Sequence, residues 1–367
     1  RYLGSNGTET AGSEAYNINS FPYDSKSFNL STQDGTPFSV SLSSSGNKLY
    51  MAGNNTDSVY QYSLSTANDI STAVYDSVSF SVTSQDTQPY DLAFKSDGTK
   101  MYILGATGDS VYQYSLSTAW DLTTASYDSV SFSINSQDED PRSFSFNSSG
   151  TKMYVMGTNL SKTVYQYSLS TAWGVSTASY DSISLNVSGQ APNALGLTFN
   201  STGTKMFVSC INNDRVYQYS LSTADDLSTA SYDNVSLDVS GQDINPYDIT
   251  FSGDDSKMYM VGLSSDTVYQ YSANFLTQTL DLSTGTTFSF TPSGATTVSF
   301  TNPPASGNAI GFSLEINGDG SAITWPSSVK WDLATAPTAT ATKELYTFVT
   351  TDGGTTYYGK KAAEGIA

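Results

Sequence analysis

The chemistry open to this chain rests on carboxylates, because the residues of most other catalytic centres are missing. The sequence has no histidine and a single cysteine, Cys210. This composition excludes Ser-His-Asp and Cys-His catalysis, His-ligated metal centres, zinc ribbons and thiol redox pairs. Asp91 and Asp248 lie in predicted innermost strands, and Asp138 and Asp140 lie in a loop before such a strand. Two carboxylates at a set separation are what a glycoside hydrolase requires.

Asp91 and Asp248 occupy one position of an internal repeat, where the other copies have Ser39, Ser143 and Gly196. Such variation is typical of a decorated repeat position, so we expect no catalytic residue and no enzymatic activity. Glycan cleavage by carboxylates is the alternative. The acidic loops lack the spacing of a dedicated calcium loop, and neither a metal nor another cofactor is expected.

The most regular polar position is a glutamine in the loop that enters the innermost strand of each repeat. It is occupied by Gln33, Gln85, Gln137, Gln190 and Gln242. Five equivalent amides would form a ring at one end of a closed repeat structure, where they could bind sugar hydroxyls. The alternative is that each amide bonds to the backbone of its own turn or of the next repeat.

Two tryptophans occupy a loop position that varies between repeats. Trp120 and Trp173 stand where other repeats have Asn68 and Asp225. A position that accepts such different residues is expected to be exposed, and an exposed tryptophan favours contact with a glycan or a neighbouring subunit. Partial burial under the loop is the alternative. The two tryptophans and the five glutamines are the predicted binding residues.

All these positions are set by the internal repeat. The tetrapeptide Val-Tyr-Gln-Tyr occurs at Val59–Tyr62, Val111–Tyr114, Val164–Tyr167, Val216–Tyr219 and Val268–Tyr271, in steps of 52, 53, 52 and 52 residues. A period near 50 residues is typical of propeller and solenoid repeats. Each repeat contains four short runs rich in Val, Ile, Tyr and Phe, separated by Gly, Asp, Asn and Ser. This pattern predicts four antiparallel strands, which is the composition of a propeller blade.

A spare strand near the N-terminus indicates how the repeats close into a ring. The fifth repeat lacks a clear fourth strand, whereas Tyr23–Leu30 matches the fourth strand of the second repeat, Tyr127–Ile134. Adding the N-terminal strand to the last blade would remove the open edges of the array. The sequence therefore predicts an all-β protein in which residues 1–274 form a five-bladed β-propeller with four-stranded blades.

The repeat ends after Ser272, and a different module follows. Several short runs with alternating apolar residues occupy the remainder of the chain, for example Ile310–Ile316 and Lys343–Val349. Short alternating strands separated by turns are typical of a small β-sandwich. We therefore predict a β-sandwich or jelly-roll-like domain over residues 275–367.

Four segments of this tail resemble a C-terminal module of tailed-bacteriophage virion proteins, especially tail fibres. The most specific is Ile323-Thr-Trp-Pro-Ser-Ser-Val-Lys-Trp331, and the others are residues 300–307, 335–338 and 346–359. Tyr357-Tyr358 stands where that module has a Trp-Tyr pair. The repeats, with Ser96-Asp-Gly-Thr-Lys-Met-Tyr102, resemble the YVTN-type propeller repeats of microbial surface and virion proteins. Neither resemblance supplies a catalytic residue.

These resemblances imply a non-enzymatic structural or adhesion component of a phage virion, such as a fibre, spike or capsid decoration protein. Its location would be the extracellular virion. Its partners would be other virion proteins and a host-surface glycan or receptor, and the chain would form a homo-oligomer such as a trimer. The alternatives are a secreted or surface-layer microbial adhesin and a glycan-binding or glycan-cleaving propeller.

Charge and hydropathy exclude two further classes of partner. The chain has 15 basic and 34 acidic residues, a formal net charge of −19, which disfavours nucleic acid because phosphate binding needs a positive surface. No apolar run approaches the roughly 18 residues of a membrane span, so no membrane insertion is expected. The sequence begins at Arg1 without a signal-like stretch. We expect either that a leader has been removed or that the sequence begins within its gene.

Overall fold

The computed structural model describes residues 17–159, 162–273, 276–292, 296–318, 323–326, 328–332 and 336–366. The chain divides into two compact units, Phe21–Ala273 and a second unit that contains Asn274–Ala367 together with the segment up to Ser20. The predicted domain boundary between residues 274 and 275 lies outside the described residues.

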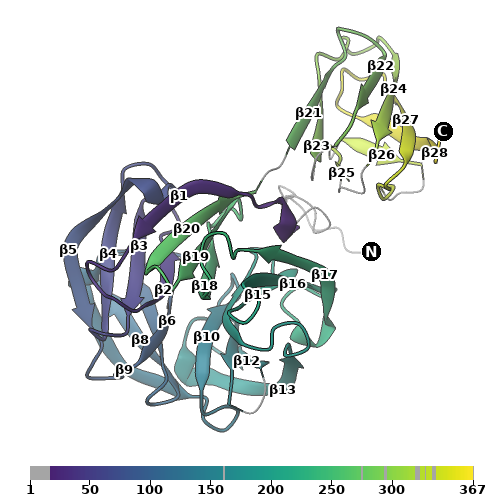
Figure 1. Ribbon diagram of the computed structural model, residues 1–367. Coiled ribbons are helices and arrows are strands. Elements are labelled where there is room, and N and C mark those ends of the chain that lie inside the picture. Colours follow the sequence, from purple (N-terminus) through teal and green to yellow (C-terminus); the bar gives the residue numbers. More distant parts are fainter. Residues whose placement is uncertain are drawn as a thin grey trace. The chain divides into compact units, whose positions relative to one another are not determined.

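The unit Phe21–Ala273 is an all-β propeller with five four-stranded blades, as the repeat predicted (Figure 1). The first blade consists of β2 (Pro37–Leu42), β3 (Lys48–Gly53), β4 (Ser58–Leu64) and β5 (Ala73–Ser81). The second consists of β6 (Pro89–Phe94), β7 (Lys100–Gly105), β8 (Ser110–Leu116) and β9 (Ala125–Ser133). The third consists of β10 (Pro141–Phe146), β11 (Lys152–Gly157), β12 (Thr163–Leu169) and β13 (Ala178–Asn186).

The fourth blade consists of β14 (Ala194–Phe199), β15 (Lys205–Cys210), β16 (Arg215–Leu221) and β17 (Ala230–Asp238). The fifth contains β18 (Pro246–Phe251), β19 (Lys257–Gly262) and β20 (Thr267–Ser272). Helix in the described residues is limited to single 3-10 turns, η1 (Ile18–Ser20), η2 (Ile70–Thr72), η3 (Leu122–Thr124), η4 (Val175–Thr177) and η5 (Leu227–Thr229). Within the described residues, no helix is long and apolar enough to cross a membrane.

The N-terminal strand closes the ring, which confirms the predicted composite blade. Strand β1 (Tyr23–Asn29) pairs antiparallel with β20, so the fifth blade has the order β1-β20-β19-β18. The Asp24 carboxylate accepts hydrogen bonds from Gln270 at 2.7 Å and Ser272 at 2.5 Å. Asp76 accepts the equivalent bond from Gln61 at 2.8 Å in the first blade. The strand that begins the chain thus makes the contacts of an ordinary fourth strand.

The Val-Tyr-Gln-Tyr motif connects neighbouring blades. In β4 the valine and the second tyrosine, Val59 and Tyr62, are fully buried, and Gln61 is only 5% exposed. The Gln61 amide donates to Asp76 of its own blade and accepts the backbone N–H of Leu122 in the next blade at 3.0 Å. A buried amide must satisfy both its donor and its acceptor groups, and here one glutamine does so across two blades.

The second unit contains two sheets. One has the order β21-β23-β25 and the other β22-β24-β27-β28-β26. Their bounds are β21 (Leu276–Asp281), β22 (Thr287–Phe290), β23 (Thr296–Thr301), β24 (Ile310–Asn317), β25 (Ile323–Thr324), β26 (Val329–Trp331), β27 (Lys343–Thr350) and β28 (Tyr357–Glu364). Apolar side chains of both sheets, including Leu280, Val298, Phe312 and Phe348, belong to one buried cluster.

Candidate functional site

Two buried aspartates lie in the innermost strands of the propeller. Asp91 in β6 and Asp248 in β18 are 4% and 5% exposed. They occupy the repeat position at which the first and third blades have Ser39 and Ser143, which are also buried. The second and fifth blades both adjoin the first in the closed ring, and the Ser39 hydroxyl, which donates to the Asp91 carboxylate, also contacts the Asp248 carboxyl. Ring closure therefore brings together two carboxylates that are far apart in the sequence.

The Asp91 carboxylate joins three blades. Its Oδ1 accepts the Ser39 hydroxyl at 2.6 Å and the Leu92 backbone N–H at 2.7 Å. Its Oδ2 accepts the Ser143 hydroxyl at 2.6 Å and the Phe144 backbone N–H at 2.7 Å. Since an ionised carboxylate offers about four lone-pair positions, these four donors satisfy it completely. Asp91 is thus built to carry a negative charge.

Asp248 has a poorer set of donors than Asp91. Apart from the Ser39 contact, its carboxylate accepts the Ile249 backbone N–H and, at a long 3.4 Å, the Val40 backbone N–H. Burial raises the pKa of Asp91 to about 6. Burial, and secondly the charge of Asp91, raises the pKa of Asp248 well above its ordinary value. Ionising both of two neighbouring buried carboxyl groups is costly, and the fuller set of donors around Asp91 favours its ionisation over that of Asp248.

Both aspartates line a cavity of about 230 Å³ that opens between the innermost strands. Its deep end contains the two carboxyls, and its outer end contains the exposed residues Ser96 and Ser148 of the turns that follow β6 and β10. Residues from all five blades contribute to its wall, namely Val40, Leu92, Phe144, Leu197 and Ile249 together with the neighbouring residues of the same strands. A small cavity lined by two buried carboxyl groups is a candidate catalytic site.

Trp173, one of the two tryptophans predicted to bind a ligand, lines the same cavity. Its ring lies 5.2 Å from that of Phe146, and its backbone carbonyl accepts the Tyr102 hydroxyl at 2.6 Å. The left-handed backbone of Trp173, with φ of 65°, places the indole over Gly150, where a Cβ would approach it to 2.3 Å. The tryptophan is therefore partly buried, as the alternative interpretation held, and glycine is required beneath it.

Trp120 has the equivalent surroundings in the preceding blade but is not among the residues that line the cavity. Its ring lies 5.3 Å from that of Phe94, and its carbonyl accepts the Tyr50 hydroxyl at 2.5 Å. It too is partly buried. A role in binding stays a prediction for both tryptophans, and the structure associates Trp173 alone with the two carboxyls.

The five predicted glutamines do not join this site. Each is partly buried, and each side-chain oxygen accepts the hydroxyl of the second motif tyrosine in its own blade. The pairs are Tyr62 with Gln33, Tyr114 with Gln85, Tyr167 with Gln137, Tyr219 with Gln190 and Tyr271 with Gln242, at 3.1–3.3 Å. Both interpretations of these residues missed this bond, because neither considered a tyrosine hydroxyl as the partner.

A second group of buried carboxylates supports the loops at the glutamine end of the strands. Asp34, Asp86, Asp138 and Asp243 each follow one of the glutamines and are 2–4% exposed. Asp86, for example, accepts the backbone N–H groups of Gln88 at 2.8 Å and Gly108 at 2.8 Å. Asp140 pairs with Arg142 at 2.7 Å. Of these four aspartates only Asp138 was a candidate from the sequence, although the Gln-Asp dipeptide repeated in four blades was a signal for the whole group.

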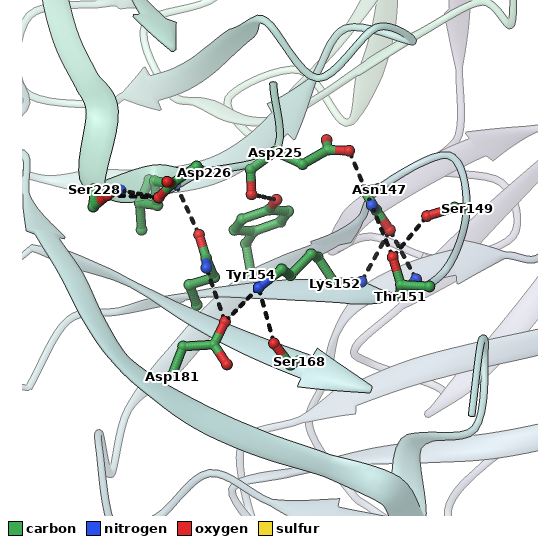
Figure 2. A network of polar contacts seen from close by, with 12 residues as sticks. Asn147, Ser149, Thr151, Lys152, Tyr154, Ser168, Asp181, Asp225, Asp226 and Ser228 are labelled. Atoms are coloured by element: carbon green, nitrogen blue, oxygen red, sulfur yellow. Dashed lines mark hydrogen bonds and ion pairs between the residues drawn. The ribbon is translucent and has the colours of Figure 1, made fainter. Parts of the chain in front are cut away.

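Polar contacts between blades fix the turn beside the cavity (Figure 2). Asn147, which lines the cavity, donates to Asp225 of the next blade at 3.0 Å and accepts the Lys152 backbone N–H at 2.9 Å. Lys152 in turn donates to Asp181 at 2.7 Å. The Tyr154 hydroxyl donates to the Asp225 carbonyl at 2.7 Å. Asn147 thus belongs to the structural network, and the wall of the cavity is held in place before any ligand binds.

Replacing Asp91 with Asn should destabilise the propeller by about 2–4 kcal/mol. The amide oxygen can accept only one of the two pairs of donors, and the NH2 group would point its hydrogens at the other pair. Urea unfolding at pH 7, followed by circular dichroism, would measure the change. Asp238→Asn, at an exposed carboxylate, is the matched control and should change stability by less than about 1 kcal/mol. Equal effects of the two substitutions would contradict the assigned role of Asp91.

Comparison with known proteins gave one family and several structures of similar fold. The model of a family described as "Lactonase, 7-bladed beta-propeller" matches residues 5–287. Similar solved structures include a periplasmic gluconolactonase of Pseudomonas aeruginosa, with 15% identity over 64% of this chain and 66% of that one and a TM-score of 0.41. Hydrazine synthase of Kuenenia stuttgartiensis has 14% identity over 66% of this chain and 97% of that one, with a TM-score of 0.39.

A Bacteroides uniformis structure described provisionally as a 6-phosphogluconolactonase has 10% identity and a TM-score of 0.40, and the match covers 55% of each chain. The present chain therefore spans about half the length of that relative. The propeller described above also has five blades, whereas the family is named for seven. No curated protein matches the sequence.

The family match overturns the prediction of a phage virion component. That prediction rested on segments between residues 300 and 359, whereas the match runs over residues 5–287 and so covers all the repeats. The predictions that depended on it are wrong as well, namely a virion location, an adhesive role and the absence of enzymatic activity. Asp91 and Asp248 share one repeat position, but their surroundings differ because their carboxyl groups accept hydrogen bonds from different donors.

Proposed function

The chain belongs to this lactonase family of β-propellers, and we propose that it hydrolyses a lactone in the cavity that ends at Asp91 and Asp248. One observation carries the proposal. Two buried carboxyl groups, Asp91 and Asp248, with unequal sets of hydrogen-bond donors line one open cavity of about 230 Å³. Hydrolysis of an ester needs a group that gives and takes protons at the reacting carbonyl, and a carboxyl with a raised pKa does so near neutral pH.

Asp248 would be the general acid and base of the reaction. In the first step the oxygen of a water molecule forms a bond to the lactone carbonyl carbon. The Asp248 carboxyl gives its proton to the carbonyl oxygen, and its other oxygen takes a proton from the attacking water. The product is a neutral tetrahedral diol, and the protonation of Asp248 is restored within the step.

Ring opening follows by the same exchange. The bond between the former carbonyl carbon and the ring oxygen breaks, and the ring oxygen receives the proton of Asp248. One hydroxyl of the diol returns a proton to the Asp248 carboxylate as its oxygen becomes the new carbonyl. The product is a hydroxy acid, and Asp248 is again protonated. No covalent intermediate is required.

Asp91 would act as a positioning residue. Its fixed negative charge, held by four donors, disfavours the ionisation of Asp248 and keeps the proton-donating form populated at neutral pH. General acid–base assistance of this kind contributes about 10²- to 10⁴-fold in rate. The wall residues contribute neutral hydroxyl groups and apolar surface, which exclude bulk water from the reacting carbonyl.

For the chain as a whole we propose the division into a propeller over residues 1–274 and a small β-sandwich over residues 275–367. The shared apolar cluster of the two C-terminal sheets supports a sandwich. The parallel pairing of β21 with β23 and of β22 with β24 favours a mixed-strand sandwich over an antiparallel jelly roll.

The experiment that tests the function is a pH-stat assay of the full chain against a panel of five- and six-membered lactones near pH 6.5. We expect saturable proton release at about 10² times the spontaneous rate or more for at least one lactone of the panel. A rate equal to that of buffer for every lactone, with the chain folded by circular dichroism, would overturn the proposal.

A further inference from the structure

We infer that the second unit carries a binding pocket for an uncharged, proline-rich segment of a partner protein. This inference goes beyond lactone hydrolysis and does not depend on it, because the residues of the pocket all belong to the second unit and none of them lines the cavity of the propeller. It comes from three properties of the pocket, namely a buried hydroxyl without a partner, a lining of flat rings and the absence of charge.

The pocket is a cavity of about 380 Å³ to which both sheets of the second unit contribute. Residues 298–300 of β23 come from the three-stranded sheet, and Tyr357 of β28 comes from the five-stranded sheet. Ser328 directly precedes β26, the edge strand that pairs with β28. Pro303 and Gly354 belong to the loops that follow β23 and precede β28. The volume is within the range of sites that bind small ligands or a few residues of a peptide.

The Tyr357 hydroxyl is the hydrogen-bonding group that the pocket leaves unused. Tyr357 is 2% exposed, and its ring lies 4.7 Å from that of Phe300. Its backbone N–H donates to the Ser328 carbonyl at 2.9 Å, but its hydroxyl makes no hydrogen bond to a described residue. Burial, and secondly the charge of Asp352, raises the pKa of Tyr357, so the hydroxyl remains a donor at neutral pH. A buried donor without a partner costs free energy, which an acceptor on a ligand would recover.

A glycine keeps the space beside this hydroxyl open. Gly354 has a left-handed backbone, with φ of 81°, which glycine adopts at no steric cost. A Cβ at this position would lie 2.5 Å from the Tyr357 hydroxyl oxygen and 2.7 Å from the Cγ of Pro303. Any other residue would therefore cover the hydroxyl and narrow the pocket.

The rest of the lining consists mainly of rings and carries no charge. Phe300, Pro303 and Pro326 supply rings in addition to that of Tyr357, and none of the described lining residues is ionised at neutral pH. Such a lining offers no partner to a charged ligand, since a buried charge needs a counter-charge or several hydrogen bonds. The ligand is therefore neutral and presents an apolar ring.

The number of hydroxyl groups favours a prolyl residue over a sugar. The Ser299 hydroxyl is already bonded to Thr279 at 3.0 Å, so the side-chain hydroxyls left to a ligand are those of Tyr357 and Ser328. A sugar ring would bury several hydroxyls against these two partners. A prolyl residue has a saturated ring, a carbonyl that can accept from Tyr357 and no N–H to satisfy. Proline-rich segments also hold their extended conformation before binding, and pockets lined by aromatic rings recognise them.

The test is isothermal titration calorimetry of the full chain with a peptide of ten prolines. We expect saturable binding with a Kd below about 1 mM. Tyr357→Phe keeps the ring and removes the hydroxyl, so it should weaken binding about 10-fold, the effect of one hydrogen bond. Its melting temperature should not fall, because the hydroxyl has no partner in the free protein. The matched control is Tyr358→Phe, at the adjacent tyrosine, which is 60% exposed and outside the lining, and it should leave Kd unchanged.

Three results would overturn the inference. The first is the absence of binding, or binding no tighter than that of a Gly-Ser peptide of the same length. The second is a Kd that Tyr357→Phe leaves unchanged or that Tyr358→Phe raises equally, since either result would place the peptide outside this pocket. The third is binding of a neutral trisaccharide such as maltotriose in preference to the peptide, which would make the pocket a glycan site.

Discussion

Replacing Asp248 with Asn should lower kcat for lactone hydrolysis by about 10²- to 10⁴-fold and change KM little. Asparagine has nearly the shape of the protonated carboxyl, but it cannot give a proton to the carbonyl oxygen and take one from water in the same step. Initial rates at saturating lactone would measure the loss. Asp238→Asn is the control for an exposed aspartate, and it should retain the wild-type rate. A kcat within about twofold of wild type would exclude Asp248 as the proton-transfer residue.

The same variant separates catalysis from folding through its pH dependence. A carboxyl whose folded pKa is raised binds more protons in the folded state than in the unfolded one, so its contribution to stability falls as pH rises from about 4 through the raised pKa. For this pair that window extends past the value of about 6 for Asp91. Asparagine carries no charge at any pH, so Asp248→Asn should gain stability relative to wild type between pH 5 and 8. A loss of stability across that window would contradict the protonated state assigned to Asp248.

The five-bladed propeller could be predicted from the sequence because the residues that repeat are the ones that pack in its core. The motif residues Val59 and Tyr62 are buried in the same way in every blade, so their period gave the blades and their number. The match of Tyr23–Leu30 to a fourth strand also gave the closure, because the same side chains make the same contacts wherever the strand originates. Burial and pairing repeat with the sequence, and periodicity therefore predicts them.

The candidate site could not be predicted from the repeat pattern, because it depends on the differences between the blades. In the repeat, Asp91 and Asp248 are two copies of one position. In the closed ring they flank Ser39, and the number of donors to each carboxyl comes from neighbouring blades that are not equivalent. The repeat pattern describes only what the blades share, so it does not contain the differences in hydrogen-bond donors around the two carboxyl groups. Trp173 was predicted as a binding residue, but nothing in the repeat pattern indicates that the cavity it lines also contains the two carboxyl groups.

Deleting residues 1–30, and with them β1, should lower the melting temperature of the propeller by about 10–20 °C and abolish lactone hydrolysis. The deletion removes the β1–β20 ladder, the fully buried Leu30 and the ion pair of Lys26 with Asp69 at 2.7 Å. Loss of a buried leucine and several hydrogen bonds amounts to about 5 kcal/mol, which corresponds to such a shift for a domain of this size. Circular dichroism melts and the pH-stat assay would measure both effects.

Activity should be lost with the strand because the strand holds the first and fifth blades together. Lys26 and Phe28 of β1 contact Asp69 and Tyr62 of the first blade, and the Ile70 backbone N–H donates to Gln270 of the fifth at 3.0 Å. The Ser39–Asp248 contact spans this same junction. A peptide of residues 17–31 added in trans should restore folding and activity together, whereas the same peptide with Phe28 and Leu30 changed to Asp should restore neither. Full activity of the truncated chain without peptide would show that the site forms without ring closure.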